Sequence, residues 1–258
     1  QERDALLSLV EGKLWDEKME IYGDLDLTTT ELKTVDTIAS YFPLACNGFN
    51  KERMARLIER IEDKQKYNSL VPLPTVSLDS PYFLKDMWRG PVWMNTAYLI
   101  IHGLQKQGHG RLAGSLAYRL CKGVYDTWKN EGNFYEFYDP NRHDIEELHR
   151  KKGNLFKAIT LGRKPVKHFA GWTADANAML VEHVIGLSNH GTDWILEPHI
   201  PRNWEGSSKP ITLSLPYHSL EISMDIEASI EEFNVSFSID GKAGKTVARN
   251  HERVALQQ

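Results

Sequence analysis

Apolar residues recur at helical spacing along most of the chain. The clearest predicted helix spans 51–62, and its apolar residues on one face are Met54, Leu57, Ile58 and Ile61. Asn50 precedes this helix, where its side chain can accept hydrogen bonds from the first free backbone N–H groups. The same spacing predicts helices over 35–46, 91–104, 111–128 and 173–185, and a helix that is already under way at residues 6–10.

The pattern changes near Pro201. Apolar and polar residues alternate in 211–215, 220–224 and 235–239, which predicts strands with one solvated face. We therefore expect a mainly α protein, with a helical-hairpin domain over 1–200 and a small antiparallel β appendage over 201–258. The segments 14–26 and 64–87 are predicted loops, the second because it carries Pro72, Pro74 and Pro81.

A long charged stretch, 139–168, separates two of the predicted helical regions. Three interpretations are open for it: a lid, a subunit contact, or a partly disordered insertion. Its histidines, His143, His149 and His168, do not follow the spacing of a zinc site.

Four short motifs occur in a fixed order: LWDEKMEIYGDLDL at 14–27, DMWRGPVWMN at 86–95, NFYEFYDP at 133–140 and FAGWT at 169–173. They resemble the signatures "LWDEE-GFYYDLDL", "YWRGPIW-N-NYL", "FYEYYDP" and "F-GWT" of glycoside hydrolase family 63 and its relatives, which include processing α-glucosidase and mannosylglycerate hydrolase. The run at 182–187, EHVIGL, is similar to an "EYVIGL" run of the mannosylglycerate-hydrolase-like set.

The resemblance implies a fold, a mechanism and a partner. The fold is the C-terminal portion of an (α/α)6 toroid of the six-hairpin glycosidase type. The mechanism is inverting hydrolysis of an α-linked glucoside or mannoside-type substrate, with Glu136 as the general base. The general-acid Asp of such enzymes lies upstream of these motifs, so we expect the N-terminal half of the toroid to come from the same longer chain or from a partner.

The residues themselves fit this chemistry. An inverting glycosidase needs two carboxylates about 6.5–9.5 Å apart, one to protonate the leaving oxygen and one to deprotonate water. Glu136 stands among aromatic residues in a loop between helices, where its carboxylate would be partly desolvated. A surface glutamate in a Tyr-rich loop is the alternative.

Substrate contacts are expected from residues of the same motifs. Trp88, Trp93 and Trp172 can stack on sugar rings, although tryptophans near helix starts also serve as core residues. The guanidinium of Arg89 can bind a hydroxyl or form a structural ion pair. We further expect Asn95 and Tyr138 to contact substrate.

Composition narrows the classes of partner. The net charge is -4, from 31 basic and 35 acidic residues, which gives no indication of nucleic-acid binding. No apolar run reaches the roughly 20 residues of a membrane span, and no cofactor or metal is expected. The two cysteines, at positions 46 and 121, are predicted to be buried thiols. The charged N-terminus is not a signal peptide, so the compartment stays open: cytoplasm, or periplasm or exterior if a signal peptide lies upstream.

Three further features have alternative interpretations. The aspartates of the first motif, Asp16, Asp24 and Asp26, are those of a calcium loop or of Asp-stabilised turns, and the turns are favoured. The triplet Asn234-Val235-Ser236 has the glycosylation pattern, for which chance is the default explanation. Finally, a non-catalytic carbohydrate-binding or structural half-toroid is the alternative function.

Overall fold

A computed structural model describes residues 1–150, 159, 162–191 and 193–256. These residues form two compact units. Unit 1 comprises Gln1–Gly108 and Arg119–Ala176, and unit 2 comprises His109–Tyr118 and Asn177–Gln258. Among the described residues, no helix combines the length and apolar character that crossing a membrane requires.

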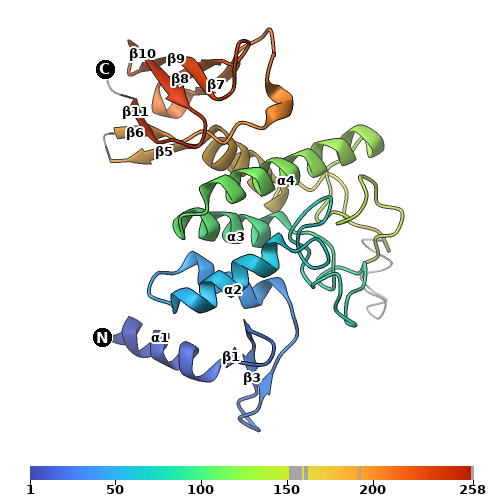
Figure 1. Ribbon diagram of the computed structural model, residues 1–258. Helices are drawn as coiled ribbons and strands as arrows, with labels where there is room; N and C mark the ends of the chain where they lie inside the picture. Colours follow the sequence, from blue (N-terminus) through green and yellow to red (C-terminus); the bar gives the residue numbers. More distant parts are fainter. Residues whose placement is uncertain (151–158, 160–161, 192, 257–258) are drawn as a thin grey trace. The chain divides into compact units, whose positions relative to one another are not determined.

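The longest elements of unit 1 are helices, joined by long segments without helix or strand (Figure 1). Its elements are α1 (Glu2–Lys13), β1 (Trp15–Asp16), β2 (Ile21–Tyr22), β3 (Asp24–Leu25), β4 (Leu32–Lys33), the 3₁₀ helix η1 (Ile38–Ala45), α2 (Lys51–Glu62), α3 (Met94–Lys106) and the 3₁₀ turn η2 (Trp172–Ala174). Helix α4 (Gly110–Glu131) begins in unit 2 and continues into unit 1.

Helix α2 has the predicted bounds because its signals are local. The Asn50 side chain accepts hydrogen bonds from the backbone N–H groups of Glu52 and Arg53, at 2.9 and 3.1 Å. The predicted apolar face, Met54, Leu57, Ile58 and Ile61, is buried. Cap and stripe together define this helix.

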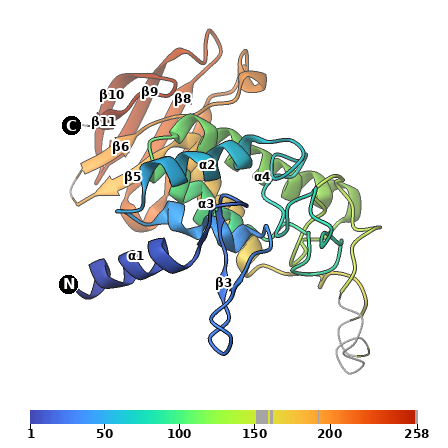
Figure 2. The same cartoon turned by 60° about the horizontal axis from the view of Figure 1, so that its bottom comes forward.

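Three other expectations need correction. The range 35–46 contains a 3₁₀ helix, not an α-helix, with Pro43 inside it. The range 14–26 is not a plain loop: β1 pairs with β2 and β3 pairs with β4, both antiparallel. Figure 2 shows the β3–β4 hairpin projecting away from the helices of unit 1. Pro91 does not open α3, which begins at Met94 with Trp93 as its N-cap.

Unit 2 holds two antiparallel sheets. One has the order β10-β9-β8-β7, and the other β11-β6-β5. The strands are β5 (Leu187–His190), β6 (Asp193–Leu196), β7 (Ile211–Leu215), β8 (Leu220–Asp225), β9 (Glu232–Ile239), β10 (Lys242–Arg249) and β11 (Val254–Leu256). Residues of both sheets share one apolar core, which includes Leu196, Ile222 and Val235. The alternation that predicted β8 and β9 appears as alternating burial along both strands.

The second unit contains more of the chain than the predicted appendage over 201–258. Strands β5 and β6 precede Pro201, and the unit takes in 177–200. The predicted helix over 173–185 is divided into η2, the α-helical turn α6 (Asp175–Met179) and the π-helical turn η3 (Leu180–Ile185). Short 3₁₀ turns η4 (Arg202–Trp204) and η5 (Pro216–His218) complete this unit.

The cysteines differ from each other. Cys121 is buried, its Sγ lies 2.9 Å from the carbonyl oxygen of Ala176, and burial raises the pKa of its thiol to about 12. Cys46 is exposed, so the prediction of a buried thiol is wrong there. Both are free thiols.

Candidate active site

Backbone pairing brings three of the four motifs together in unit 1. Val92 and Tyr138 exchange two hydrogen bonds, at 2.8 and 2.9 Å, so the Trp93 segment and the Glu136 loop lie side by side. Tyr135 forms an antiparallel bridge with Lys167, and the hydroxyl of Thr173 donates to the carbonyl oxygen of Tyr135 at 2.6 Å. The Glu136 loop is therefore held between the other two motifs.

Gly90 allows the first of these segments to make its turn. Its φ is +139°, a conformation that L side chains rarely adopt. A Cβ at this position would lie 2.2 Å from the carbonyl oxygen of Leu84. Both the backbone conformation and the close carbonyl oxygen therefore favour glycine between Arg89 and Pro91.

An aromatic group forms where these segments meet: Trp88, Trp93, Phe137 and Trp172. Trp88 stacks on Trp93 with ring centroids 3.8 Å apart and planes 8° apart. Trp172 lies 5.5 Å from Trp93 and 6.2 Å from Trp88, between centroids, and Phe137 lies 5.1 Å from Trp93. Trp93 is buried, whereas Trp88 is 42% exposed and Trp172 is 46% exposed.

The buried Trp93 fixes this group in place. Its indole N–H donates to the carbonyl oxygen of Met87 at 2.9 Å, which ties the ring to its own loop. Trp88 and Trp172 thus stand on a rigid base with much of their ring surface in contact with solvent. Exposed, oriented indoles of this kind suit stacking against a sugar ring. Trp93 contributes as their support.

The other residues predicted to bind substrate lie in different surroundings. Arg89 is exposed. Asn95 lies in the first turn of α3, and within the described part of the chain its buried Oδ1 has no hydrogen-bond partner. Tyr138 is 1% exposed, and its hydroxyl accepts the backbone N–H of Tyr135 at 3.2 Å. This ring supports the loop, and a substrate contact of Tyr138 stays a prediction.

The Glu136 carboxylate is 5% exposed and is held by two residues of the charged stretch, Arg150 and Val166. Arg150 Nε lies 2.7 Å from Oε1, and Arg150 Nη2 donates to Oε2 at 3.2 Å. The backbone N–H of Val166 donates to Oε1 at 3.2 Å. Glu136 is therefore a buried, paired carboxylate and not a free surface glutamate.

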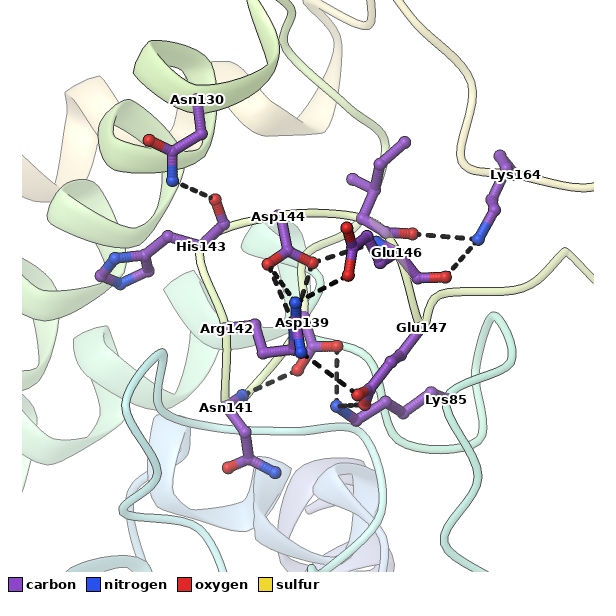
Figure 3. Close-up of polar contacts among 11 residues, drawn as sticks. Lys85, Asn130, Asp139, Asn141, Arg142, His143, Asp144, Glu146, Glu147 and Lys164 are labelled. Atoms are coloured by element: carbon purple, nitrogen blue, oxygen red, sulfur yellow. Dashed lines mark hydrogen bonds and ion pairs between the residues drawn. The ribbon is translucent and has the colours of Figure 1, made fainter.

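Charged side chains brace the loop that follows Glu136 (Figure 3). Lys85 lies 2.8 Å from the fully buried carboxylate of Asp139 and 2.5 Å from that of Glu147. Arg142 pairs with Asp144 at 2.9 Å and with Glu146 at 2.8 Å. The Asp139 carboxylate also accepts the backbone N–H of Asn141 at 2.8 Å.

The contacts give the described part of the stretch 139–168 a role outside the three interpretations: it supports the Glu136 loop. Residues 151–158, 160 and 161 lie outside the described residues, and the interpretation of that part stays a prediction.

The sequence motifs do not predict four residues that hold the Glu136 loop in place: Arg150, Val166, Lys85 and Asp139. Lys85 and Asp139 have a sequence signal, since Lys85 precedes the second motif and Asp139 stands inside the third. Arg150 has none, because its pairing with Glu136 depends on how the charged stretch folds back.

The first motif lies elsewhere in unit 1, and two of its three aspartates, Asp16 and Asp26, stabilise turns. Asp16 accepts the backbone N–H groups of Lys18 and Met19, both at 2.9 Å. Asp26 accepts those of Thr28 and Thr29. These hydrogen bonds, the one from Met19 foremost for Asp16 and the one from Thr29 for Asp26, lower the pKa of each carboxyl. Within the described ranges, no three His, Cys, Asp or Glu side chains gather in a way that could hold a metal ion.

Comparison with known proteins decides the family. The model of the mannosylglycerate hydrolase MGH1-like glycoside hydrolase domain matches residues 1–155, which is more than half of the chain. The chain belongs to this glycoside hydrolase family. The match includes Glu136, Trp88, Trp93 and the bracing residues Lys85 and Asp139.

Individual relatives agree with this membership. Mannosylglycerate hydrolase of Thermus thermophilus is 34% identical over 131 residues, which cover 49% of this chain and 29% of the relative. Mannosyl-oligosaccharide glucosidase of Saccharomyces cerevisiae is 24% identical over 194 residues, covering 67% of this chain and 20% of the relative. The chain thus spans between a fifth and a third of the length of these two relatives.

Among solved structures, neutral trehalase of Saccharomyces cerevisiae resembles the chain with a TM-score of 0.51 and 15% identity, covering 69% of this chain and 29% of that one. At this level of identity the likeness concerns the fold alone.

Proposed function

We propose that this chain carries the general base and part of the sugar-binding surface of an inverting glycoside hydrolase. The substrate class is an α-linked glucoside or mannoside. The observation that carries the proposal is the meeting of the Glu136 loop with exposed Trp88 and Trp172 through backbone pairing. The family, whose relatives include a mannosylglycerate hydrolase and a glucosidase, supports the same chemistry.

In the proposed reaction, Glu136 takes a proton from a water molecule while the water oxygen attacks the anomeric carbon. The bond from that carbon to the leaving oxygen breaks, and a general acid protonates the leaving oxygen. We propose that the acid is an Asp from a segment outside these 258 residues, and that the helices of this chain form part of an (α/α)6 toroid completed by that segment.

The test uses the longest natural protein that contains this chain, with a panel of α-glucosides and α-mannosides that includes mannosylglycerate and trehalose. Glu136→Gln keeps the shape of the side chain and removes the base, so kcat should fall by about 10²–10⁴-fold. The matched control is Glu59→Gln, an exposed glutamate of α2. Proton NMR of the first product should show the β anomer from an α-linked substrate, which is the signature of inversion.

A second candidate is a carbohydrate-binding or structural module without turnover. The observation in its favour is that both oxygens of the Glu136 carboxylate are already engaged. Turnover of Glu136→Gln and sugar binding by the parent protein distinguish the two candidate functions. If Glu136→Gln and the parent protein hydrolyse the panel equally, Glu136 is not the base. If the parent binds these sugars, with heat detectable by calorimetry, yet cleaves none of them, the binding module is correct.

A further inference from the structure

The Glu136 carboxylate has an arginine partner in the charged stretch. The side chain of Arg150 is only 13% exposed and that of Glu136 is 5% exposed, so the pair is largely shielded from water. The guanidinium contacts both oxygens: Nε lies 2.7 Å from Oε1 as an ion pair, and Nη2 donates a hydrogen bond to Oε2 at 3.2 Å. Two contacts from one planar group fix the rotation of the carboxylate as well as its position.

Backbone hydrogen bonds hold Arg150 in place on both sides. Its N–H donates to the carbonyl oxygen of Arg163 at 2.8 Å, which joins the described parts of the charged stretch before and after its undescribed residues. His149 N–H donates to the carbonyl oxygen of Lys85 at 2.8 Å, and Met87 N–H donates to that of His149 at 3.1 Å. Arg150 is thus attached to the segment that leads into Trp88.

Each carboxylate oxygen can accept about two hydrogen bonds. Oε1 accepts the N–H of Val166 and is also crowded by Arg150 Nε, which lies 2.7 Å away without forming a hydrogen bond. Oε2 accepts a hydrogen bond from Arg150 Nη2. Oε2 is therefore the less crowded oxygen and keeps one acceptor position for water.

We propose that Arg150 is a positioning residue for Glu136, which leaves Oε2 as the oxygen that takes the proton from water. This inference rests on the proposed role of Glu136 as general base. Arg150 also supplies the opposite charge that a buried carboxylate needs, since burial of an unpaired charge is unfavourable by several kcal/mol. The described part of the charged stretch is then a support for catalysis.

The test compares Arg150→Met and Arg150→Lys with Arg56→Met in the same full-length protein. Arg56 lies on α2, outside the charged stretch, is 54% exposed and pairs with Glu59, so its variant controls for the loss of a paired arginine as such. A small misplacement of a catalytic group can reduce the rate by about 10²-fold, so Arg150→Met should lower kcat by roughly 10–100-fold with KM nearly unchanged. Arg150→Lys restores the charge without the planar guanidinium and should recover part of kcat. The Arg56→Met variant should keep the parent kcat.

A glycosyl fluoride separates the base from the acid. Fluoride leaves the anomeric carbon with little need of a proton donor, so hydrolysis of α-glucosyl or α-mannosyl fluoride reports mainly on water activation. The Arg150→Met loss of kcat should persist with these substrates, measured by fluoride release. A loss confined to ordinary glycosides would overturn the assignment, because it would place Arg150 at the leaving-group side.

A labelling experiment tests, without an activity assay, whether Arg150 holds the Glu136 carboxylate. A water-soluble carbodiimide with glycinamide converts accessible carboxylates to amides, and peptide mass spectrometry locates the product. Glu136 should react slowly in the parent and in Arg56→Met, and faster in Arg150→Met. Equal reactivity of Glu136 in all three proteins would overturn the proposal that Arg150 holds this carboxylate.

The failures of the two proposals are distinguishable. If Glu136→Gln retains turnover, the proposed function fails whatever the labelling shows. If Glu136→Gln is inactive but Arg150→Met has the parent kcat, only the role of Arg150 fails. A rise of kcat in Arg150→Met would also overturn it, because the guanidinium would then be blocking the base.

Discussion

A pair of histidines in unit 2, His199 buried and His251 half-buried, should make this unit sensitive to mild acid. His199 and His251 face each other with their Nδ1 atoms 2.8 Å apart, so one ring donates a hydrogen bond and the other accepts it. The ring of His199 is 3% exposed and packs against α4, where a Cβ on Gly114 would lie 2.3 Å from the Cβ of His199. Protonation of the accepting ring would remove the acceptor and leave a charge where His199 is shielded from water.

The surrounding charges do not compensate for such a proton. Burial, together with a smaller contribution from the neighbouring His251, lowers the pKa of His199 from 6.5 to about 4. Burial also lowers the pKa of His251, with a contribution from Arg111 and an opposing one from Glu231. Glu197 Oε1 is 3.7 Å from Nε2 of His199, beyond hydrogen-bond distance.

The sign and size of the effect follow from these pKa values. Between the folded and unfolded pKa values, the unfolded chain binds a proton that the folded chain does not, so stability falls as the pH falls. One pKa unit corresponds to about 1.4 kcal/mol, and a shift from 6.5 to about 4 then removes about 2 kcal/mol between about pH 7.5 and about pH 5. The loss begins as the pH drops through the unfolded value.

Hydrogen exchange measured by mass spectrometry reports the stability of unit 2 separately from that of unit 1. Peptides from β8 and β9 report on the opening of unit 2, and conversion to protection factors removes the intrinsic pH dependence of exchange. A loss of about 2 kcal/mol corresponds to a decrease of about thirtyfold in protection.

His199→Asn removes the titrating ring and keeps a polar group near the position of Nδ1, so most of the decrease should disappear. His109→Asn, at an exposed position of the same unit, is the control and should behave like the parent. The reasoning is refuted if His199→Asn loses as much protection as the parent between the two pH values.

Two further changes test the fold and the site of unit 1. Asp36→Asn leaves Arg60 without its buried counter-charge and should lower the free energy of unfolding by about 3 kcal/mol in a urea titration. Glu31→Gln, which breaks an exposed pair, should change it by less than about 1 kcal/mol, and equal effects would contradict the role of burial. Trp88→Ala removes an exposed stacking ring and should raise KM about tenfold with little change in kcat, whereas Trp128→Ala, an exposed tryptophan outside the aromatic group, should leave KM unchanged. A kcat effect without a KM effect would argue against stacking on the substrate.

Local patterns predicted the elements whose causes are local. The Asn50 cap and the apolar stripe that follows it lie within one helix, so α2 has the predicted bounds. Strand β7 also has them, because alternation of polar and apolar residues needs only the strand itself. The short hairpins in 14–33 escaped prediction because strands of two residues are too short to show a period.

Elements with competing causes were predicted less well. The range 35–46 is apolar enough for a buried α-helix, yet Pro43 has no N–H to donate, and the segment forms a 3₁₀ helix against α3. Hydrogen bonds from Lys106 and Gln107 to the carbonyl oxygens of Ala45 and Leu44 fix that position. Such contacts come from residues far along the chain.

For the candidate site, the sequence by itself identified Glu136 and the tryptophans as candidates, because the motifs that contain them are continuous and resemble those of a known family. It also determined the family, to which the chain belongs. Only the tertiary structure decided that Trp88 and Trp172 are exposed while Trp93 supports them, and that Arg150 holds Glu136. The physical reason is range: a cap, a stripe or a motif is written in neighbouring residues, whereas burial and the pairing of a charge depend on which distant segments the folded backbone brings together.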